Sequence, residues 1–487
     1  MLYPEIRNFI GGEWVNSQST QHTPVTNSAT GEVLGQCPLS TTEETNAAIE
    51  AAHTAFQSWK NVPPVQRARY IFKFKQLLED NKEEIARLCT MEHGKTLAEA
   101  RGDIGRGIEN VEHACGIPSL MMGKSLSNVA NGIDCASYRE PMGVFAAITP
   151  FNFPPMVPLW FLPYAIATGN TVVLKPSEQV PLSQQLIFKL LQETGLPAGV
   201  VNMVNGGKDV VNALCEHKNV KGVSFVGSTP VAQIVYDKAS QNGKRVQSLG
   251  GAKNFLIVMP DAKMGPAMEN VAESIFGCAG QRCLAGAIVV GVGEAYNKVK
   301  EGLLENARNI KMGYGLDDES TMGPVISRDQ QHRILSMIDK AKEQGATPLL
   351  DRSRETVPGY ENGYWVGPTV FENINPEMEI AQKEVFGPVA CLTKADTLED
   401  AIAMLNKIPF ANAGSIYTSN GESVRKFRRG VDPAMLGINI GVAAPMAFFP
   451  FGGSKDSFFG STKVHGEDAI HFYTEQKVEI SRWFEDQ

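Results

Sequence analysis

Residues 141–174 read PMGVFAAITPFNFPPMVPLWFLPYAIATGNTVVL, and this stretch decides the fold class. It contains no Asp, Glu, Lys, Arg or His, but prolines at 150, 154, 155, 158 and 163 and Gly169-Asn170 interrupt it. A membrane-spanning helix needs about 20 mostly uninterrupted apolar residues. We therefore expect buried strand, turn and short helix inside a large core, not a membrane span.

Short apolar runs alternate with helical stretches from about residue 143 onward. Such alternation is typical of a parallel sheet covered by helices on both faces, which binds ligands at the carboxyl ends of its strands. The predicted strands are Val144–Ile148, Thr171–Leu174, Val200–Val204, Val223–Val226 and Phe255–Met259, with helices at Ser183–Glu193 and Val231–Ser240. A second alternating unit starts near residue 270, with a strand at Ile288–Val292, helices at Glu294–Ile310 and Asp329–Gln344, and strands near residues 390 and 415.

The two flanks of the chain differ from this pattern. The early region is predicted to be helical, with a capping box in residues 40–44, a helix boundary at Pro63-Pro64 and a further helix over Arg101–Cys115. The tail from Ile470 to Trp483 alternates apolar and polar residues, as an edge or intersubunit strand does.

Length and composition narrow the function classes. A chain of 487 residues suggests about three domains. The net charge of −8 gives no broad positive field for nucleic acid or anionic lipid. Eight cysteines without a CxxC pair disfavour a disulfide framework and a structural zinc site, so we expect no metal. The N-terminus resembles neither a signal peptide nor a transit peptide, so we expect a cytoplasmic protein.

Familiar catalytic motifs fail when their spacing is checked. Gly94-Lys95-Thr96 resembles the end of a phosphate-binding P-loop, but the first glycine of that pattern would fall at Cys89. The stretch after Gly291-Val292-Gly293 does not complete GxGxxG, and HExxH and GxSxG are absent from the sequence. Metal-dependent and serine hydrolysis therefore lose support.

Residues 276–285 read FGCAGQRCLA and place two cysteines between a predicted helix and a predicted strand. Small neighbours allow close approach to the sulfur atoms. Arg282 is a cation next to Cys283, and a nearby cation lowers a thiol pKa and favours the nucleophilic thiolate. Cys283 is therefore a candidate nucleophile. The alternative is that Cys278 and Cys283 are both buried core cysteines, the commoner fate of a free cysteine.

Two candidate sites follow predicted strands. Asn152, between aromatics and prolines, has an amide that could stabilise an oxyanion, or it satisfies the backbone of a turn. Lys175 and Glu178 stand where a parallel sheet presents ribose-binding groups, and a carboxylate there favours NAD over NADP. The alternative for this pair is a surface ion pair.

Two further candidates concern a nucleotide. Ser228 suits the N-cap of a helix with Pro230 in its first turn, and free N–H groups there can bind a pyrophosphate or simply begin an ordinary helix. Glu384 and Phe386 beside a turn could contact a nicotinamide riboside, or they belong to an ordinary loop.

Taken in order, these motifs resemble the NAD(P)-dependent aldehyde dehydrogenase superfamily. The resemblance covers essentially the whole chain, from FIGGEWVNS at 9–17 through PFNFP, LKPSE, FVGST, GGAKN, GQRC and EVFGP to FFPFGGSKDSFFG at 448–460. Residues 148–178, with GAKNFLIVMPDA and FGCAGQRCLA, look like the CoA-acylating branch that oxidises methylmalonate and malonate semialdehydes.

The resemblance implies a role for each matching residue. Cys283 would form a thiohemiacetal with the aldehyde, Asn152 and the Cys283 N–H would form the oxyanion hole, and hydride transfer to NAD would leave a thioester on Cys283. Arg106 and Arg282 would hold the substrate carboxylate, although a solvated helix face is the plainer reading of Arg106. The cofactor-contact positions are Thr149, Phe151, Lys175, Glu178, Gln179, Gly227, Ser228, Gly250, Glu384 and Phe386.

One departure from the superfamily pattern bears on the second half of the reaction. Hydrolytic members carry a Glu directly before the LGG-like segment, where it activates water, and Ser248 stands at that position here. Serine is a poor general base near neutral pH. Coenzyme A is then the plausible second substrate, giving propanoyl-CoA or acetyl-CoA with loss of CO2 or bicarbonate.

The resemblance also implies the architecture, which is an α/β fold with three units. We expect an NAD-binding domain of parallel sheet (1–118 and 141–252), an α/β catalytic domain (253–455), a small β oligomerisation element (119–140 and 456–487) and a homotetramer.

Two other functions remain open. One is a hydrolytic semialdehyde dehydrogenase that uses Glu384 through water, and the other is an inactive relative that serves in binding or structure.

Overall fold

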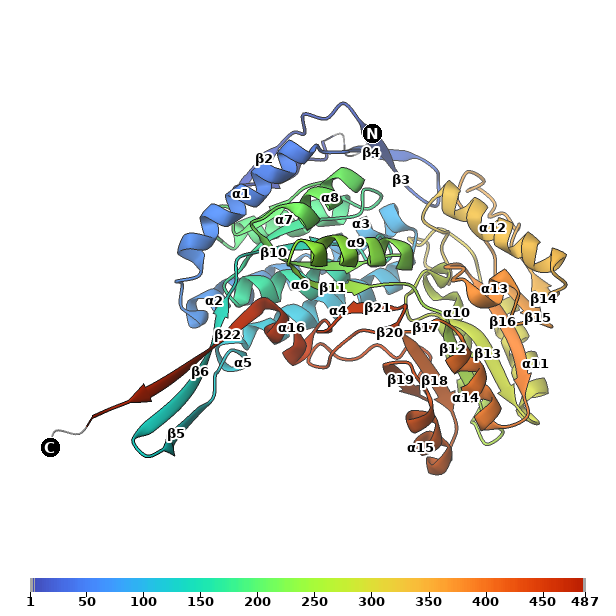
Figure 1. The fold of residues 1–487 in the computed structure, drawn as a ribbon. Helices are drawn as coiled ribbons and strands as arrows, with labels where there is room; N and C mark the ends of the chain where they lie inside the picture. Colours follow the sequence, from blue (N-terminus) through green and yellow to red (C-terminus); the bar gives the residue numbers. More distant parts are fainter. Residues whose placement is uncertain (1–2, 4, 485–487) are drawn as a thin grey trace.

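The stretch that decided the fold class lies at the centre of an eight-stranded sheet in the computed structural model, which describes residue 3 and residues 5–484 (Figure 1). β7 (Val144–Ile148) and β8 (Thr171–Lys175) pair in parallel, and α6 (Met156–Ala167) connects them through the core. The prediction of buried strands and a short buried helix is confirmed. The sheet runs in the order β2 (Glu13–Val15), β1 (Asn8–Ile10), β9 (Val201–Met203), β8, β7, β10 (Val220–Val226), β11 (Arg245–Leu249) and β21 (Phe458–Gly460).

Helices cover both faces of this sheet. Successive strand residues point to opposite sides, and in the central strands both sets are buried and so need to be covered. Phe145 and Ala147 belong to the core cluster beneath α2 (Pro64–Asp80), α4 (Leu97–Cys115), α6 and α7 (Leu182–Glu193). Val144, Ala146 and Ile148 belong to the cluster beneath α1 (Thr42–Trp59), α8 (Lys208–Glu216) and α9 (Thr229–Gln241). The five central strands are parallel, and β1, β2 and β21 close the two edges in antiparallel fashion. The carboxyl ends of β7, β8, β10 and β11 therefore lie along one edge.

A second, seven-stranded sheet forms the other half of the molecule (Figure 1). One expectation is corrected here: the run predicted at Phe255–Met259 with the first set of strands is β12, and it pairs with β13 and β18 of the second sheet. Its apolar pattern is that of any doubly covered parallel strand, so the pattern alone does not assign it to a sheet. The order is β14 (Thr347–Asp351), β15 (Thr369–Glu372), β16 (Val389–Ala395), β13 (Gly286–Val292), β12 (Asn254–Val258), β18 (Ala413–Tyr417) and β19 (Met435–Ile438).

A three-stranded antiparallel arm extends from the body (Figure 1), with β22 (Thr474–Arg482) beside β6 (Ile133–Pro141) and β5 (Ser125–Ala130). The tail predicted as one strand from Ile470 to Trp483 is a strand only from 474. The preceding residues form α16 (Gly466–Tyr473), because Ile470, Phe472 and Tyr473 are buried against the body. The arm itself exposes large apolar side chains, among them Ile480 at 72%.

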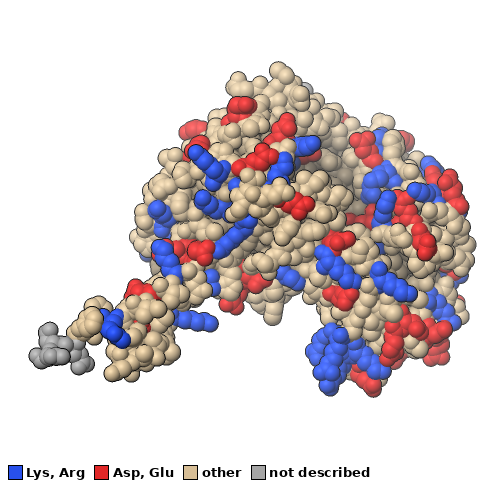
Figure 2. Space-filling view, in the orientation of Figure 1, with Lys and Arg blue, Asp and Glu red and all other residues tan. Residues whose placement is uncertain are grey.

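The remaining elements agree closely with the predicted helices, including a capping box between Thr41 and Glu44. No helix in the described part of the chain is long and apolar enough to cross a membrane. Acidic and basic side chains are interspersed over the face in Figure 2, and α15 carries the densest basic cluster there. The other helices are α1 (Thr42–Trp59), α2 (Pro64–Asp80), α3 (Lys82–His93), α4 (Leu97–Cys115), α5 (Ile117–Leu120), α7 (Leu182–Glu193), α8 (Lys208–Glu216), α9 (Thr229–Gln241), α10 (Met264–Phe276), η1 (Gly277–Gly280), α11 (Ala295–Asn309), α12 (Arg328–Glu343), α13 (Glu379–Gln382), α14 (Leu398–Lys407) and α15 (Gly421–Gly430). The other strands are β3 (His22–Thr26), β4 (Val33–Pro38), β17 (Phe410–Ala411) and β20 (Ser454–Lys455).

The close packing of α4 on α6 depends on a glycine. A Cβ at Gly107 would lie 2.7 Å from Leu159 Cδ1 and 3.2 Å from the Met156 Cα, which is too close without movement of α6. A Cβ at Gly102, on the same helix, would meet nothing within 4 Å. Gly107 permits the two helices to approach each other, and Gly102 has no such role.

We predict opposite effects for alanine at these two positions. Gly107→Ala should destabilise the protein by about 1–3 kcal/mol through overpacking. Gly102→Ala should leave stability unchanged or raise it by up to about 1 kcal/mol, because alanine has the higher helix propensity. Thermal melting of both variants measures this, and equal melting temperatures would contradict the proposed α4–α6 contact.

Candidate active site

Cys283 lies in the turn between η1 and β13 and lines a cavity of about 410 Å³. The cavity is enclosed by α4, by the start of α6 and by the segment 442–451. Its walls include four carboxylates, two arginines and a histidine among apolar side chains: Glu99, Asp103, Glu109, Glu273, Arg106, Arg282, His465, Phe153, Trp160, Leu284, Val442 and Phe451. The Cys283 thiol is half-buried at the wall of this cavity, where a small substrate can reach it.

Two carboxamides hold the backbone of Cys283 from the second sheet. Asn254 Nδ2, at the start of β12, donates to the Cys283 carbonyl at 3.0 Å, and Asn412 Nδ2, just before β18, donates to the same oxygen at 2.9 Å. Asn254 also donates to the Ala285 carbonyl and accepts from the Ala413 N–H. The nucleophile is thereby fixed to two adjacent strands.

The thiol itself is not activated by its neighbours. Burial and, second, the charge of Glu384 raise the pKa of Cys283 to about 12, and Arg282 lowers it only slightly. Arg282 thus lowers the thiol pKa in the expected direction, but burial and Glu384 outweigh it, so the pKa stays above its usual value. The physical reason is that desolvation of the thiolate exceeds the attraction of a cation that points elsewhere.

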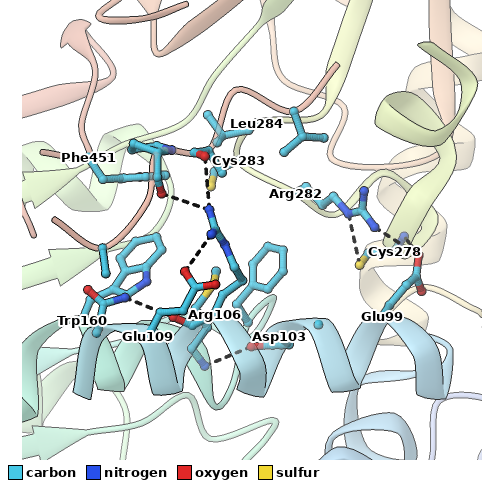
Figure 3. Close-up of a pocket in the computed structure, with 18 of the residues that line it drawn as sticks. Glu99, Asp103, Arg106, Glu109, Trp160, Cys278, Arg282, Cys283, Leu284 and Phe451 are labelled. Atoms are coloured by element: carbon cyan, nitrogen blue, oxygen red, sulfur yellow. Dashed lines mark hydrogen bonds and ion pairs between the residues drawn. The ribbon is translucent and has the colours of Figure 1, made fainter. Parts of the chain in front are cut away.

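Arg282 is directed toward Cys278 and Glu99 (Figure 3). Its Nε lies 3.3 Å from Cys278 Sγ, and its Nη2 lies 3.3 Å from Glu99 Oε1. Glu99 also accepts from the Cys278 N–H at 2.6 Å, where Cys278 has a positive φ of 50°. Arg282 lines the cavity as predicted, but its charge is already paired, so its role toward a substrate stays a prediction.

A buried ion pair supports the loop that carries Asn152. Lys95 Nζ lies 2.6 Å from Asp103 Oδ2, with both side chains fully buried, and donates to the Asn152 carbonyl at 2.8 Å. Although burial disfavours a charged amine, Asp103 raises the pKa of Lys95 above its usual value. Asp103 Oδ1 in turn accepts from the Met156 N–H at 2.9 Å. The pair thus holds both ends of the turn that leads from β7 into α6.

The side chain of Asn152 is brought toward the nucleophile's turn. Its Nδ2 donates to the Gln281 carbonyl at 3.2 Å. A carboxamide nitrogen carries two N–H donors, so one remains for an oxyanion. The structure therefore brings Asn152 and Cys283 to one region, as the sequence predicted.

Arg106 projects from α4 into the cavity (Figure 3), and its guanidinium contacts the segment 444–446. Its guanidinium lies 2.7 Å from Glu109 Oε2 and donates to the carbonyls of Ala444 at 3.1 Å and Pro445 at 3.0 Å. Arg106 therefore does not lie on a purely solvated helix face. It is a cation at the wall of the cavity that is held by a carboxylate and two carbonyls.

Eight predicted cofactor positions follow the carboxyl ends of neighbouring parallel strands. Lys175 ends β8, and its Nζ lies 2.9 Å from Glu178 Oε2. Burial raises the pKa of Glu178, but the positive charge of Lys175 outweighs burial and lowers that pKa below its usual value. Ser228 occupies the N-cap of α9, but its hydroxyl makes no capping hydrogen bond there. The full set at this edge comprises Thr149 and Phe151 after β7, Lys175, Glu178 and Gln179 at and after β8, Gly227 and Ser228 after β10, and Gly250 after β11.

Glu384 and Phe386 reach the same edge from the second sheet. The Phe386 ring lies 5.8 Å from the ring of Phe151, edge to face, and a Cβ on Gly251 would lie 2.6 Å from Glu384 Oε2. Burial raises the pKa of Glu384 to about 7. The two halves of the molecule therefore meet where the nucleotide motifs and the nucleophile converge.

Ser248 is poorly suited to act as a base in this structure. It is buried in β11, and its Oγ donates to the Ala232 carbonyl of α9 at 2.8 Å. The hydroxyl proton is thus committed to a helix on the face of the sheet. At the position expected to carry a glutamate in hydrolytic members, this chain has a buried serine that joins β11 to α9.

Sequence reasoning missed three contributors to the site. In the sequence, Lys95 belongs only to the incomplete P-loop pattern, and Asn254 only to GGAKN. Asn412, in the stretch Phe410–Ala413, carries no motif that would single it out. Polar residues inside apolar surroundings were the available signal, because such groups are costly to bury without a partner.

The chain belongs to the aldehyde dehydrogenase family, because the model of that family matches residues 14–478. Among its relatives is a malonate-semialdehyde dehydrogenase of Halalkalibacterium halodurans, 49% identical over 98% of each chain. A putative methylmalonate-semialdehyde dehydrogenase from Sinorhizobium meliloti, solved in complex with NAD, superposes with a TM-score of 0.98 at 41% identity over 100% of this chain and 99% of that one. The methylmalonate-semialdehyde dehydrogenase of Oceanimonas doudoroffii gives 0.97 at 45% identity over 99% of each chain.

We predict that Glu384→Gln makes Cys283 more reactive. Above pH 7 the ionised Glu384 raises the thiol pKa, so removing its charge should speed alkylation by iodoacetamide at pH 8.5 by about three- to tenfold, equivalent to a pKa lower by about half to one unit. Mass spectrometry of the Cys283 peptide over time measures the rate. Glu377→Gln, at an exposed carboxylate, is the control, and an unchanged or slower rate in Glu384→Gln would contradict the proposed coupling.

Proposed function

We propose that the protein oxidises methylmalonate semialdehyde, and malonate semialdehyde, with NAD and coenzyme A to give propanoyl-CoA or acetyl-CoA and CO2. The observation that carries this proposal is the combination of a half-buried nucleophile, Cys283, at the cavity wall with a buried Ser248 that is a poor base for activating water. The names of the relatives from Halalkalibacterium halodurans and Sinorhizobium meliloti support the semialdehyde as substrate.

The Cys283 thiol first loses its proton to water. The thiolate Sγ then attacks the aldehyde carbon, and the new C–S bond converts the carbonyl oxygen into an oxyanion. The free N–H of the Asn152 carboxamide and the Cys283 backbone N–H stabilise that oxygen. Bound NAD supplies the hydride acceptor. Departure of the aldehyde hydrogen as hydride restores the carbonyl and leaves an acyl thioester on Cys283.

The edge formed by β8, β7, β10 and β11 fits a dinucleotide. Lys175 and Glu178 offer a donor and an acceptor for ribose hydroxyls, and the negative charge of Glu178 disfavours a 2′-phosphate. The start of α9 offers unpaired N–H groups for a pyrophosphate, and the absence of a capping bond from Ser228 leaves its hydroxyl available as well. These features support NAD.

The thioester places a carbonyl β to the substrate carboxylate. When the C–CO2 bond breaks, its electron pair enters that carbonyl, CO2 leaves, and the α-carbon takes up a proton. A thiol then attacks the thioester carbonyl and releases Cys283, so the acyl group leaves as a new thioester. Because Ser248 is committed to Ala232, water is a poor competitor in this step.

Arg106 is the residue best placed to recognise the carboxylate. Its guanidinium lies at the cavity wall with carbonyl and carboxylate partners that a substrate carboxylate can replace. Charge-assisted hydrogen bonds of this kind are stronger than neutral ones. Arg282 contributes a second positive charge to the same cavity, partly offset by Glu99.

The arm is the proposed oligomerisation element, and we propose a homotetramer. β5, β6 and β22 present exposed apolar residues that a second copy would cover, namely Leu126, Val129, Tyr138, Val478 and Ile480. The predicted units 1–118 with 141–252, and 253–455, correspond to the cofactor and catalytic functions in this proposal. Light scattering measures the assembly.

A hydrolytic reaction remains the second candidate because one observation favours it. The pKa of Glu384 is raised to about 7, which suits a general base near neutral pH. Such an enzyme would release the free acid without any thiol.

We predict that turnover depends on CoA. With malonate semialdehyde and NAD alone, NADH should form in a burst equal to the number of Cys283 sites and then slow by at least about tenfold, because the thioester has no efficient acceptor. Added CoA should restore turnover and yield acetyl-CoA, measured by absorbance and chromatography. Equal rates with and without CoA, with free acid as the product in both, would establish the hydrolytic alternative.

We predict that Arg106→Met raises KM for malonate semialdehyde by about 10- to 100-fold, the value of one charge-assisted contact of about 1.5–3 kcal/mol. The kcat/KM for propanal, which lacks the carboxylate, should change far less. Arg101→Met serves as the control because Arg101 lies on the same helix and pairs with Glu83 on the surface. A proportional loss for both aldehydes would show that Arg106 acts only through the packing of 444–446.

A further inference from the structure

His465 lines the same cavity as Cys283 and Arg106, and nothing in the reaction described so far uses it. It directly precedes α16 and has a φ of +72° and a ψ of 171°, a conformation that residues other than glycine rarely adopt. Its side chain makes no capping hydrogen bond to α16. The imidazole therefore does not cap α16, which is the usual role of a side chain directly before a helix.

The backbone on both sides of His465 is held in place. Val464 and Phe451 exchange two backbone hydrogen bonds, at 3.1 and 2.7 Å, and the Gly466 N–H donates to the Ala447 carbonyl at 3.0 Å. A Cβ at Gly466 would lie 2.7 Å from the Phe448 carbonyl oxygen, so the chain has little freedom there. Strained conformations that the surroundings enforce in this way cluster at ligand sites.

The imidazole is buried without a polar partner. His465 is 3% exposed, and neither ring nitrogen has a hydrogen-bond partner within the described residues. Its ring instead packs edge to face on Trp160, with centroids 4.8 Å apart, and lies 5.6 Å from the ring of Phe451. Burying polar groups without partners costs free energy, so an unpaired imidazole at a cavity wall indicates that a ligand completes its hydrogen bonding.

The charge at this end of the cavity indicates the chemistry of that ligand. Burial is the main cause that lowers the pKa of His465 to about 3, and the charge of Arg106 is the second. The imidazole is therefore neutral near pH 7. A neutral imidazole offers one N–H donor and one acceptor. The nearby Arg106 makes the surroundings favourable for an anion, which would use the donor.

We propose that His465 is a substrate-binding residue that donates a hydrogen bond to the carboxylate of the aldehyde substrate, beside Arg106. The inference rests on the proposed function, because it assumes a carboxylate in this cavity. Within that function it assigns a second recognition group that carries no charge of its own. It therefore adds a directional contact without adding another positive charge to the cavity.

The test uses His465→Leu against His465→Asn, since leucine and asparagine have similar shapes and differ in the polar carboxamide. Both retain a Cβ and thus meet the same backbone constraint. His465→Met and His465→Gln form a second matched pair if either of the first does not fold. Malonate is the probe, because it is a dicarboxylate that cannot be oxidised, and its ability to slow alkylation of Cys283 by iodoacetamide measures binding without turnover.

The expected result is that His465→Leu raises the malonate concentration for half-protection by about tenfold, while His465→Asn stays within about threefold of the unaltered protein. In steady state, kcat/KM for malonate semialdehyde should fall in His465→Leu relative to that for propanal. Equal protection of the leucine and asparagine variants would overturn the role proposed for His465 and leave the proposed function intact. A lack of malonate protection in the unaltered protein would instead overturn carboxylate recognition and hence the proposed function.

Discussion

The buried ammonium group of Lys95 joins the parts of the molecule on which the site depends. It binds Asp103 of α4 at 2.6 Å and the carbonyl of Asn152 at 2.8 Å, and Asp103 binds the first N–H of α6. Removing one member of such a pair would leave an unpaired charge in the core, at a cost of about 3–5 kcal/mol. The loop that presents the oxyanion-stabilising amide is therefore fixed by an electrostatic requirement of the core and not by its own turn geometry.

Pairing of buried charge explains the chemistry around Cys283 as well. Arg282 is held by Glu99, and Arg106 by Glu109, so the cavity is not simply cationic. The thiol is protonated at rest because burial and Glu384 raise its pKa. His465 is the exception, since its nitrogens find no partner among the described side chains and backbone groups. In the proposed function, the substrate carboxylate accepts from this histidine and exchanges with the partners of Arg106.

Much of this organisation follows from the sequence. Uncharged apolar runs in Val144–Ile148 and Thr171–Leu174 predict a doubly covered parallel sheet, and β7 and β8 confirm it. Periodicity cannot assign β12 to the second sheet, because pairing partners depend on contacts distant in the chain. Nor can it show the direction of Arg282, since an adjacent position in sequence does not determine where a long side chain points. The clamp on Cys283 by Asn254 and Asn412 joins it to residues 29 and 129 positions away, which no local pattern links.

The central claim is that Cys283 carries the acyl group and that water removes it slowly. The most direct measurement is peptide mass spectrometry after the protein has reacted with malonate semialdehyde and NAD without a thiol and has been quenched in acid. The account predicts one acetyl group on the tryptic peptide that begins at Cys283, and its disappearance after a chase with CoA. An unmodified Cys283 peptide, or acylation at Cys278 instead, would contradict the account.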